Sequence, residues 1–338
     1  MYLNSFFGPD TLSRFCRRHP IKMAPASFKG IFSPTENRSR EKESGFGVSG
    51  RVETLVVWAT GLTTQQNLLK DSFSLPTLLV LGGLGQGVLS LVLPSRYALL
   101  PLVFLLLRAV VCTARDVTSL ERFVAERGVI KGRTSGQLPN ISYDPVRSDK
   151  ASPFGSAPAE RNIVVLHLGA RFNHPLGGLA PGSKEVADKF IACHKEVLGR
   201  AKEFGCLGGT SYRGDETASN NTLMTIYYFR DLEGLNRFAH DRIHREVWDW
   251  YNKECVKKGY SHIGIFHEAF CAQAGAYETI YVNMQPTLLG AGSADVKNEA
   301  TGTDEWARTV VDASGSVWRS QHSRMGREVK RGEAGNRA

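Results

Sequence analysis

Two long apolar runs dominate the pattern of hydrophobic and polar residues along the chain. The first covers residues 75–93 and is interrupted by one amide, Gln86, and two hydroxyl groups. The second covers residues 97–113 and carries Arg108 near its end. A helix needs about 20 residues to cross the hydrocarbon core of a bilayer, and neither run has the polar face of a helix on a soluble protein. We therefore predict a transmembrane helical hairpin over residues 75–113.

The residues within and beside the hairpin predict its contacts and its orientation. Gly83 and Gly87 lie about one helical turn apart, which would let the second helix approach closely. Basic residues in the N-terminal arm, together with Arg108 and Arg115, favour a cytosolic position for both ends of the hairpin. We expect the protein to be located in a membrane, that of the endoplasmic reticulum, with the domain that follows facing the cytosol.

Three segments lack the periodicity of helices or strands. Residues 1–70 are rich in Ser, Gly, Arg and Lys and are predicted to form a disordered basic arm. Residues 116–160 begin with a short amphipathic juxtamembrane helix and continue as a linker rich in Gly, Ser and Pro. Residues 291–338 are polar and patternless, so we predict a disordered C-terminal tail.

Residues 161–290 combine strand and helix patterns in a regular order. Ser183 is expected to cap a helix that Gly205 ends, and Asp231 to cap a helical segment that ends near Lys258. The predicted strands are residues 162–171, 206–213, 221–230, 261–272 and 276–283. The order β-α-β-β-α-β with one further strand predicts an α+β fold of the ferredoxin-like type.

Alternation along the first strand assigns its two faces. Val164, Leu166 and Leu168 form one apolar face that should meet the helices, whereas His167 and Arg171 point to the opposite side. A sheet with helices on one side only leaves its other face bare. We therefore predict a homodimer whose two sheets close face to face around a cavity, which is a dimeric α/β barrel.

The stretch from His240 to Tyr251, HDRIHREVWDWY, is the densest in groups able to carry out chemistry. His240, His244 and Trp248 follow one another at intervals of four residues and share one helix face. Either one histidine acts as a base beside a Trp-lined pocket, or both pack at the edge of the apolar stripe. No metal site is expected, because residue 241 is Asp instead of the Glu of an HExxH motif and spacing places no third ligand.

Further candidate residues lie on the strands. His267 and Glu268 point to opposite faces of a strand, so only one of them can enter a pocket. The catalytic candidates are His244, His240 and His267. The substrate-binding candidates are Trp248, His167, Arg171, Phe172 and Asn173. For each of these residues a purely structural role is the alternative.

The bulk composition argues against several classes of function. The net charge is +9, but no run of five or six like charges occurs, so we expect anionic lipid rather than nucleic acid as the partner of the basic segments. The six cysteines lie far apart, which suits a reducing compartment rather than a disulfide framework. No GxGxxG, GK[ST] or GxSxG motif occurs, so we expect no nucleotide, flavin or serine-hydrolase site.

Three blocks of the chain resemble one known family. They are FNHPLGGLAPG (Phe172–Gly182), MTIYYFRDLEGLNRFAHDRIHREVWDWY (Met224–Tyr251) and GIFHEAFCAQAGAYETIYVNMQP (Gly264–Pro286). The GLGQG and PSRYALLP segments of the apolar runs are similar as well. The resemblance is to the fungal monooxygenase family typified by the hydroxylase of the fumagillin cluster, which is of the antibiotic-biosynthesis-monooxygenase type.

The resemblance implies a dimeric α/β barrel that hydroxylates a small hydrophobic intermediate of secondary metabolism, a terpenoid or a polyketide. O2 is then the co-substrate, and no organic cofactor is expected. Such chemistry needs a base and a dry pocket. Two other functions remain open: a haem-dependent enzyme of the same barrel family, such as an aldoxime dehydratase, and a non-catalytic ligand-binding or scaffolding module. The substrate and the oxidised carbon are left unspecified by the sequence.

Overall fold

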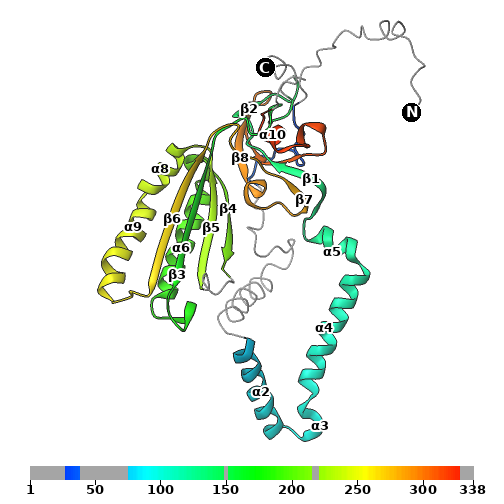
Figure 1. The fold of residues 1–338 in the computed structure, drawn as a ribbon, viewed down its shortest axis with the longest axis vertical. Helices are drawn as coiled ribbons and strands as arrows, with labels where there is room; N and C mark the ends of the chain where they lie inside the picture. Colours follow the sequence, from blue (N-terminus) through cyan, green and yellow to red (C-terminus); the bar gives the residue numbers. More distant parts are fainter. Residues whose placement is uncertain (1–26, 39–74, 148–150, 215–220, 328–338) are drawn as a thin grey trace, which may run out of the picture.

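The computed structural model describes residues 27–38, 75–147, 151–214 and 221–327 (Figure 1). Its largest sheet is antiparallel and has the strand order β4-β5-β3-β6. The strands are β3 (Ile163–Phe172), β4 (Cys206–Arg213), β5 (Thr222–Phe229) and β6 (Ile263–Ala272). With one helical segment after β3 and another after β5, this order is the ferredoxin-like arrangement, so the α+β fold predicted from the sequence is confirmed.

The helices between the strands begin and end at residues whose side chains or backbone favour such ends. They are α6 (Ser183–Gly199), α7 (Ala201–Phe204), α8 (Leu232–His240) and α9 (Arg242–Trp250), the last continued by a π-helical turn, η2 (Tyr251–Cys255). Asp231 accepts a hydrogen bond from the Gly234 N–H (2.7 Å) and caps α8 as predicted. Gly205 ends α7 with φ of 62°, also as predicted. Ser183 does not cap α6, because that position belongs to Gly182.

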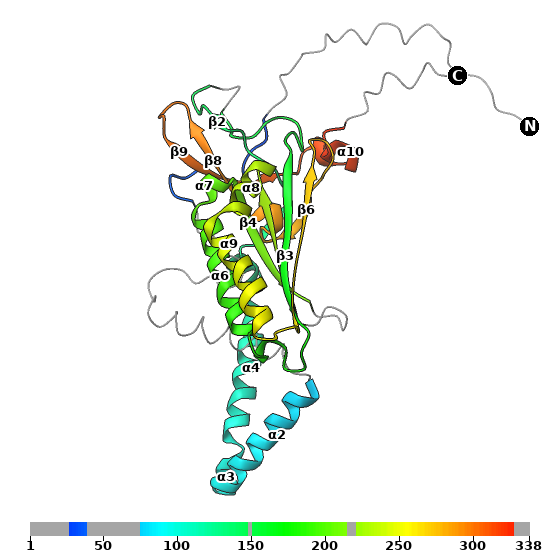
Figure 2. The same cartoon turned by 90° about the vertical axis from the view of Figure 1, so that its left-hand side faces the viewer.

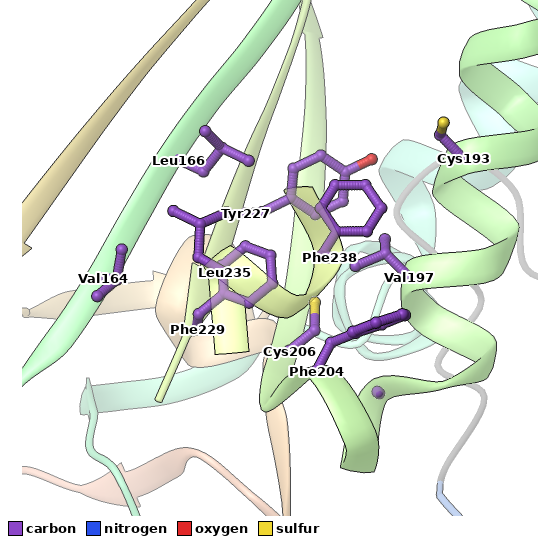
Figure 3. Packing of buried hydrophobic residues seen from close by; sticks show 11 residues of the cluster. Val164, Leu166, Cys193, Val197, Phe204, Cys206, Tyr227, Phe229, Leu235 and Phe238 are labelled. Carbon is purple, nitrogen blue, oxygen red and sulfur yellow. The ribbon is translucent and has the colours of Figure 1, made fainter. Parts of the chain in front are cut away.

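The helices cover one face of this sheet, and the main hydrophobic core lies between the helices and the sheet (Figures 2 and 3). Val164 and Leu166 of β3 pack there with Val197 of α6 and Phe238 of α8. Leu168 packs against the same cluster. The predicted apolar face of the first strand therefore meets the helices, which confirms the assignment of its two faces.

Two small sheets form a further layer that the sequence patterns did not reveal. One has the order β10-β1-β7, and the other has the order β2-β8-β9. Their strands are β1 (Ile130–Gly136), β2 (Ser142–Tyr143), β7 (Tyr281–Met284), β8 (Ser293–Asn298), β9 (Asp304–Arg308) and β10 (Val310–Asp312). The expected fifth strand therefore leaves the main sheet, since β7 pairs with β1.

These strands correct the predicted linker and the predicted tail. The linker expected within residues 116–160 contains β1 and β2, and the tail expected over 291–338 contains β8, β9 and β10 as far as it is described. Val296, Val310 and Val311 are buried there. Each strand is short. β8 and β9 are close in the sequence and pair with each other, but β1 and β2 pair with strands more than a hundred residues away, so local composition gives no sign of those pairings.

Part of the predicted N-terminal arm is also built into this layer. Gly30 forms a β-bridge with Val311, and Thr35 with Trp306. Phe28 is buried, and its ring centroid lies 4.6 Å from that of Trp318 in the 3-10 turn η4 (Ser316–Trp318). A last short helix, α10 (Gln321–Arg324), follows. Disorder is therefore the wrong prediction for residues 27–38, and the rest of 1–70 lies outside the described residues.

The second layer covers one end of the sheet face that was expected to be bare. Ile163 and Val165 of β3 pack there with Leu138 and with Leu289 of η3 (Leu288–Ala291). On the same face, Phe270 of β6, the register partner of Val165, and Phe266, further along β6, remain exposed. The surface left for a second subunit is therefore smaller than a whole sheet face.

The two apolar runs form two exposed helices joined by a short turn (Figures 1 and 2). The elements are α2 (Leu75–Val92), α3 (Ser95–Ala98), α4 (Leu100–Thr118) and, beyond them, α5 (Leu120–Glu126). By length and composition alone, α2 and the segment Ser95–Thr118 are able to cross a membrane. Gln86 donates a hydrogen bond through Nε2 to the Ala98 carbonyl (2.9 Å) and ties α2 to the turn. A Cβ atom on Gly83 or Gly87 would meet nothing within 4 Å, so the predicted close helix contact is not formed.

Candidate functional site

The position of α9 on the sheet is set by its first residues. Asp241 caps the helix, because its Oδ1 accepts a hydrogen bond from the Ile243 N–H (3.1 Å). Its Oδ2 accepts a hydrogen bond from Arg200 (2.8 Å), which follows α6. Burial disfavours the charged carboxylate, but the hydrogen bonds from Arg200 and Ile243 outweigh this effect, and the pKa of Asp241 is lowered. A charged Asp241 therefore ties the start of α9 to α6.

His244 lies one turn into α9 and is partly buried. Its Nδ1 atom is 2.9 Å from the Ala239 carbonyl oxygen, and its ring centroid is 5.4 Å from that of Phe238. Because a carbonyl oxygen can only accept a hydrogen bond, Nδ1 carries the proton of the neutral ring and Nε2 keeps its lone pair. Burial lowers the pKa of His244, the Ala239 hydrogen bond partly opposes this, and nearby His267 and His240 lower it further. His244 is thus a neutral imidazole with a basic nitrogen available.

The structure brings His240 and His267 into the electrostatic neighbourhood of His244. His240 is exposed at the end of α8, with its Nδ1 atom 2.8 Å from the Asn236 carbonyl oxygen. His267 on β6 pairs in register with Leu168 on β3, so it lies on the face of the sheet that carries the helices. The three catalytic candidates therefore come from α8, α9 and β6 and are near enough for His240 and His267 to influence the charge of His244.

Trp248 lies one turn beyond His244 on α9, as its spacing predicted, and half of its surface is exposed. At this exposure the indole ring belongs to the surface of the helix and not to the core. It therefore remains a candidate for contact with an apolar ligand. The prediction that His240 shares this helix face with His244 and Trp248 is wrong, because α8 ends at His240 and the extended Asp241 separates it from α9.

His167 and Arg171 lie on the opposite face of the sheet from His244. The His167 Nδ1 atom is 3.9 Å from Glu268 Oε2, and its ring meets that of Phe270 edge-on at 5.5 Å. Arg171 is half-buried on the same face, with its Nε atom shielded from solvent. The predicted site residues thus divide into two groups with the sheet between them, and a single pocket within one subunit cannot contain both.

The last two substrate-binding candidates occupy different environments. Phe172 is buried and packs with Val186, Cys255 and Ile263, so its side chain is part of the core. Asn173 is exposed, and its backbone N–H donates to the His262 carbonyl (2.7 Å). Neither side chain lies with the three histidines on α8, α9 and β6.

A second polar pair in the helix-covered core was not predicted. His194 Nδ1 of α6 lies 2.7 Å from the hydroxyl of Tyr227 on β5. Tyr227 is buried in the main hydrophobic core (Figure 3). The signal that could have found this pair is weak. His194 directly follows the buried Cys193 on the apolar stripe of α6, and Tyr227 occupies an inward position on β5.

An open groove of about 610 Å³ lies at the end of the sheet nearest the second layer. Arg161, Arg230, Leu232 and Cys271 are among its lining residues, and none of the predicted site residues is. Separately, the described ranges contain no group of three or more His, Cys, Asp or Glu side chains arranged to hold a metal ion.

Comparisons with known proteins add a family. A model of the family "Monooxygenase af470-like" matches residues 163–289. The curated protein Monooxygenase af470 of Aspergillus fumigatus is 39% identical to this chain over 262 residues, which cover 77% of this chain and 90% of that protein. The family model thus covers the ferredoxin-like domain, and the similarity to the curated protein extends well beyond it.

Among solved structures, an aldoxime dehydratase aligns with a TM-score of 0.31 and 15% identity over 45% of this chain and 43% of its own. A candidate antibiotic biosynthesis monooxygenase from Nitrosomonas europaea aligns with a TM-score of 0.24 and 5% identity over 33% of this chain and 88% of its own. At these TM-scores, neither likeness carries a conclusion about this chain.

Proposed function

Because the chain belongs to the af470-like monooxygenase family and is an oxidoreductase, we propose that it oxygenates a small hydrophobic substrate with O2 and without flavin or haem. The substrate class is an intermediate of secondary metabolism, a terpenoid or a polyketide. The observation that carries this proposal is His244. Its lowered pKa and its free Nε2 give the site a base at neutral pH, which is the group that cofactor-free oxygenation requires.

The chemistry starts with transfer of a proton from an acidic C–H group of the substrate to Nε2 of His244. The resulting carbanion passes one electron to O2, and the carbon radical and superoxide combine to a peroxide. Loss of water from the protonated peroxide of a methylene group leaves a carbonyl. One O2 then gives one carbonyl oxygen and one water, and no outside reductant is used. Hydroxylation of a single C–H group takes up two more electrons, which a reductant has to supply.

The residues around His244 suit the other needs of this reaction. Phe238, Ile243 and Val247 bring apolar surface to the helix-covered side of the sheet. Such surface excludes water, which would otherwise compete for the proton and for the radical pair. We assign His267 and His240 to orienting the substrate or the peroxide, because they are the titratable neighbours of His244.

The proposal includes a membrane anchor and a homodimer. The exposed, apolar α2 and α4 support anchoring, in the endoplasmic reticulum with the folded domain in the cytosol. The exposed Phe266 and Phe270 on the face of His167 support a second copy of the chain as the cover of this part of the sheet. In such a dimer, His167 and Arg171 would line a space shared by the two subunits.

Oxygen uptake by the purified full-length protein in detergent tests this function. The probes are apolar, enolisable ketones and dihydroxyaromatic compounds, without added flavin or metal. We expect uptake with some of these compounds, and a loss of about 10²- to 10⁴-fold in His244→Gln, the usual range for general acid–base catalysis. His322→Gln changes an exposed histidine of α10 and is the control, which should keep full activity. Equal activity of both variants would remove His244 from the mechanism.

The alternative is a haem-dependent enzyme of the same barrel family. A free Nε2 can also bind iron, so His244 is the residue that would hold a haem. Haem would supply a redox-active iron, and any electrons for reducing O2 would have to come from a separate reductant. The absorption spectrum of the protein after haem addition separates the two functions, because a Soret band that disappears in His244→Gln supports the haem enzyme and contradicts the cofactor-free one.

A further inference from the structure

An ordered loop, residues 173–182, joins β3 to α6 at the end of the sheet farthest from the second layer (Figure 1). The 3-10 turn inside it, η1 (Gly177–Leu179), is closed by backbone hydrogen bonds. The Gly177 N–H donates to the His174 carbonyl (2.8 Å), and the Leu179 N–H donates to the Leu176 carbonyl (2.9 Å). The backbone of this loop therefore has a defined shape.

Neighbouring segments hold the loop in place. His262 donates through Nε2 to the Pro181 carbonyl (2.9 Å), and the Asn173 N–H donates to the His262 carbonyl (2.7 Å). Gly177 has φ of 52°, and a Cβ atom there would lie 2.6 Å from Oδ1 of Asn221. The close approach and the positive φ both require glycine at this position.

This rigid loop points two leucine side chains into solvent. Leu176 is 53% exposed and Leu179 is 50% exposed. Val256, which follows η2 at the same end of the domain, is 68% exposed. Burying these side chains costs little further conformational entropy of the loop, because its backbone is already ordered. Such a feature is typical of a surface that meets an apolar partner.

The position of the two apolar helices identifies the partner. In both views the first turn of α2 lies level with this end of the sheet, α2 continues away from the domain, and α4 returns towards it (Figures 1 and 2). If α2 lies in hydrocarbon from its first turn onward, the loop therefore lies at the bilayer surface. Exposed Lys184, Lys257 and Lys258 flank it; Lys184 pairs with Asp188 (2.5 Å) and Lys258 with Glu185 (3.0 Å). Basic residues commonly flank apolar side chains at the edge of anionic membranes.

We infer that the end of the domain formed by the loop 173–182 and by Val256 docks onto the lipid bilayer, with Leu176 and Leu179 inserted below the headgroups. The inference rests on the membrane anchoring proposed above and adds a second, peripheral contact between the folded domain and lipid. This contact fixes the domain against the membrane, so that an apolar substrate dissolved in the bilayer reaches the protein without crossing water.

Spin labels measure this contact in the full-length chain. Cys16, Cys112 and Cys271 are first changed to Ser, while the buried cysteines are kept. One nitroxide label is then attached to Leu179→Cys, Ile141→Cys or Leu84→Cys. Each protein is reconstituted into vesicles of phosphatidylcholine with about one-fifth phosphatidylserine. The ratio of collision rates with O2 and with a water-soluble nickel chelate reports the depth of the label.

The matched control is Ile141→Cys, because Ile141 is 69% exposed and lies near the second layer, at the opposite end of the domain. We expect a ratio at position 179 that is about 3-fold or more above that at position 141, as for a side chain inserted several Å into the interface. The label at Leu84 in α2 should give a still higher ratio.

Three other results overturn the inference. Equal ratios at 179 and 141, with Leu84 in hydrocarbon, would leave the anchor intact and remove the docking. A label at Leu84 that is accessible to nickel would remove the membrane anchoring and the docking together. Dipolar broadening between labels at position 179 in detergent would show that a second copy of the chain, rather than lipid, covers the loop.

Discussion

Arg200 donates a hydrogen bond to Oδ2 of Asp241 across 2.8 Å and so joins the end of α6 to the beginning of α9. The same guanidinium binds the carboxylates of Glu196 (3.0 Å) and Glu203. His244 follows Asp241 by three residues, so the place of its ring over the sheet depends on this contact. Arg200 and Asp241 are therefore positioning residues for the candidate base.

Removing the Asp241 carboxylate tests this positioning. In Asp241→Ala, α9 loses its cap and its tie to α6, and we expect a loss of about 1 kcal/mol in stability. Asp231→Ala is the matched control, because it removes the cap of α8 at a similar cost without touching α9. Only Asp241→Ala should lower kcat and shift the pH profile of oxygen uptake. Similar profiles for both variants would mean that the cap has no part in placing His244.

The pH dependence of the reaction should follow the neutral form of His244. Burial lowers the pKa of this residue below its ordinary value of about 6.5. The acidic limb of kcat/KM should therefore lie below this pH, and His244→Gln should abolish it. The stability of the fold should also rise with pH, because the unfolded chain binds the proton of His244 more tightly than the folded chain does. The contribution of neutral His244 to folding stability is full above about pH 6.5 and is lost as the pH falls through the lower folded pKa. Denaturant unfolding of wild type and variant at several pH values measures it.

Phe270 should report on the dimer. It is 50% exposed and lies beside His167 on the sheet face that is free of helices. Phe270→Asp would place a charge in an apolar interface, so we expect the protein in detergent to sediment as a monomer. Val256→Asp introduces the same charge at another exposed apolar position and should leave the sedimentation coefficient unchanged. A wild-type protein that is already monomeric at micromolar concentration contradicts the dimer.

Deletion of residues 75–113 tests the anchor. Among the residues that the structure describes, neither the main sheet nor the second layer pairs or packs with this segment, so the rest of the chain should fold without it. We expect the shortened protein to be released from membranes by carbonate and the full-length protein to resist extraction. Retention of the shortened, folded protein after carbonate treatment would assign the anchor to another segment.

Trp318 tests whether the C-terminal strands belong to the folded core. Its ring is 2% exposed and packs against Phe28. Trp318→Ala should cost about 3–5 kcal/mol, the usual loss for a buried aromatic side chain. Trp248→Ala is the control, because that side chain is 50% exposed and should cost much less. Chemical unfolding followed by far-UV circular dichroism measures the loss of stability in each variant. Equal small losses in both variants would support the prediction of a disordered C-terminal tail.

The sequence by itself determined the elements whose signal is local. The apolar runs predicted α2 and α4, because each run is long enough and apolar enough to form one continuous helix. Alternation placed Val164, Leu166 and His167 on their correct faces, and Asp231 and Gly205 marked helix ends through hydrogen bonds and backbone angles that involve only nearby residues. The order of these elements was enough for the ferredoxin-like sheet.

Only the tertiary structure decided the pairings between distant segments and the division of the candidate site. The partners of β1 are β7 and β10, well over a hundred residues away. Loop-closure entropy opposes the pairing of such distant segments, so these short strands pair only when the whole fold has formed. Alternation along the strand showed that His267 and Glu268 face opposite sides of the sheet. Only the register with β3 showed that His267 lies on the same side of the sheet as His244. The same register puts the sheet between His244 and His167.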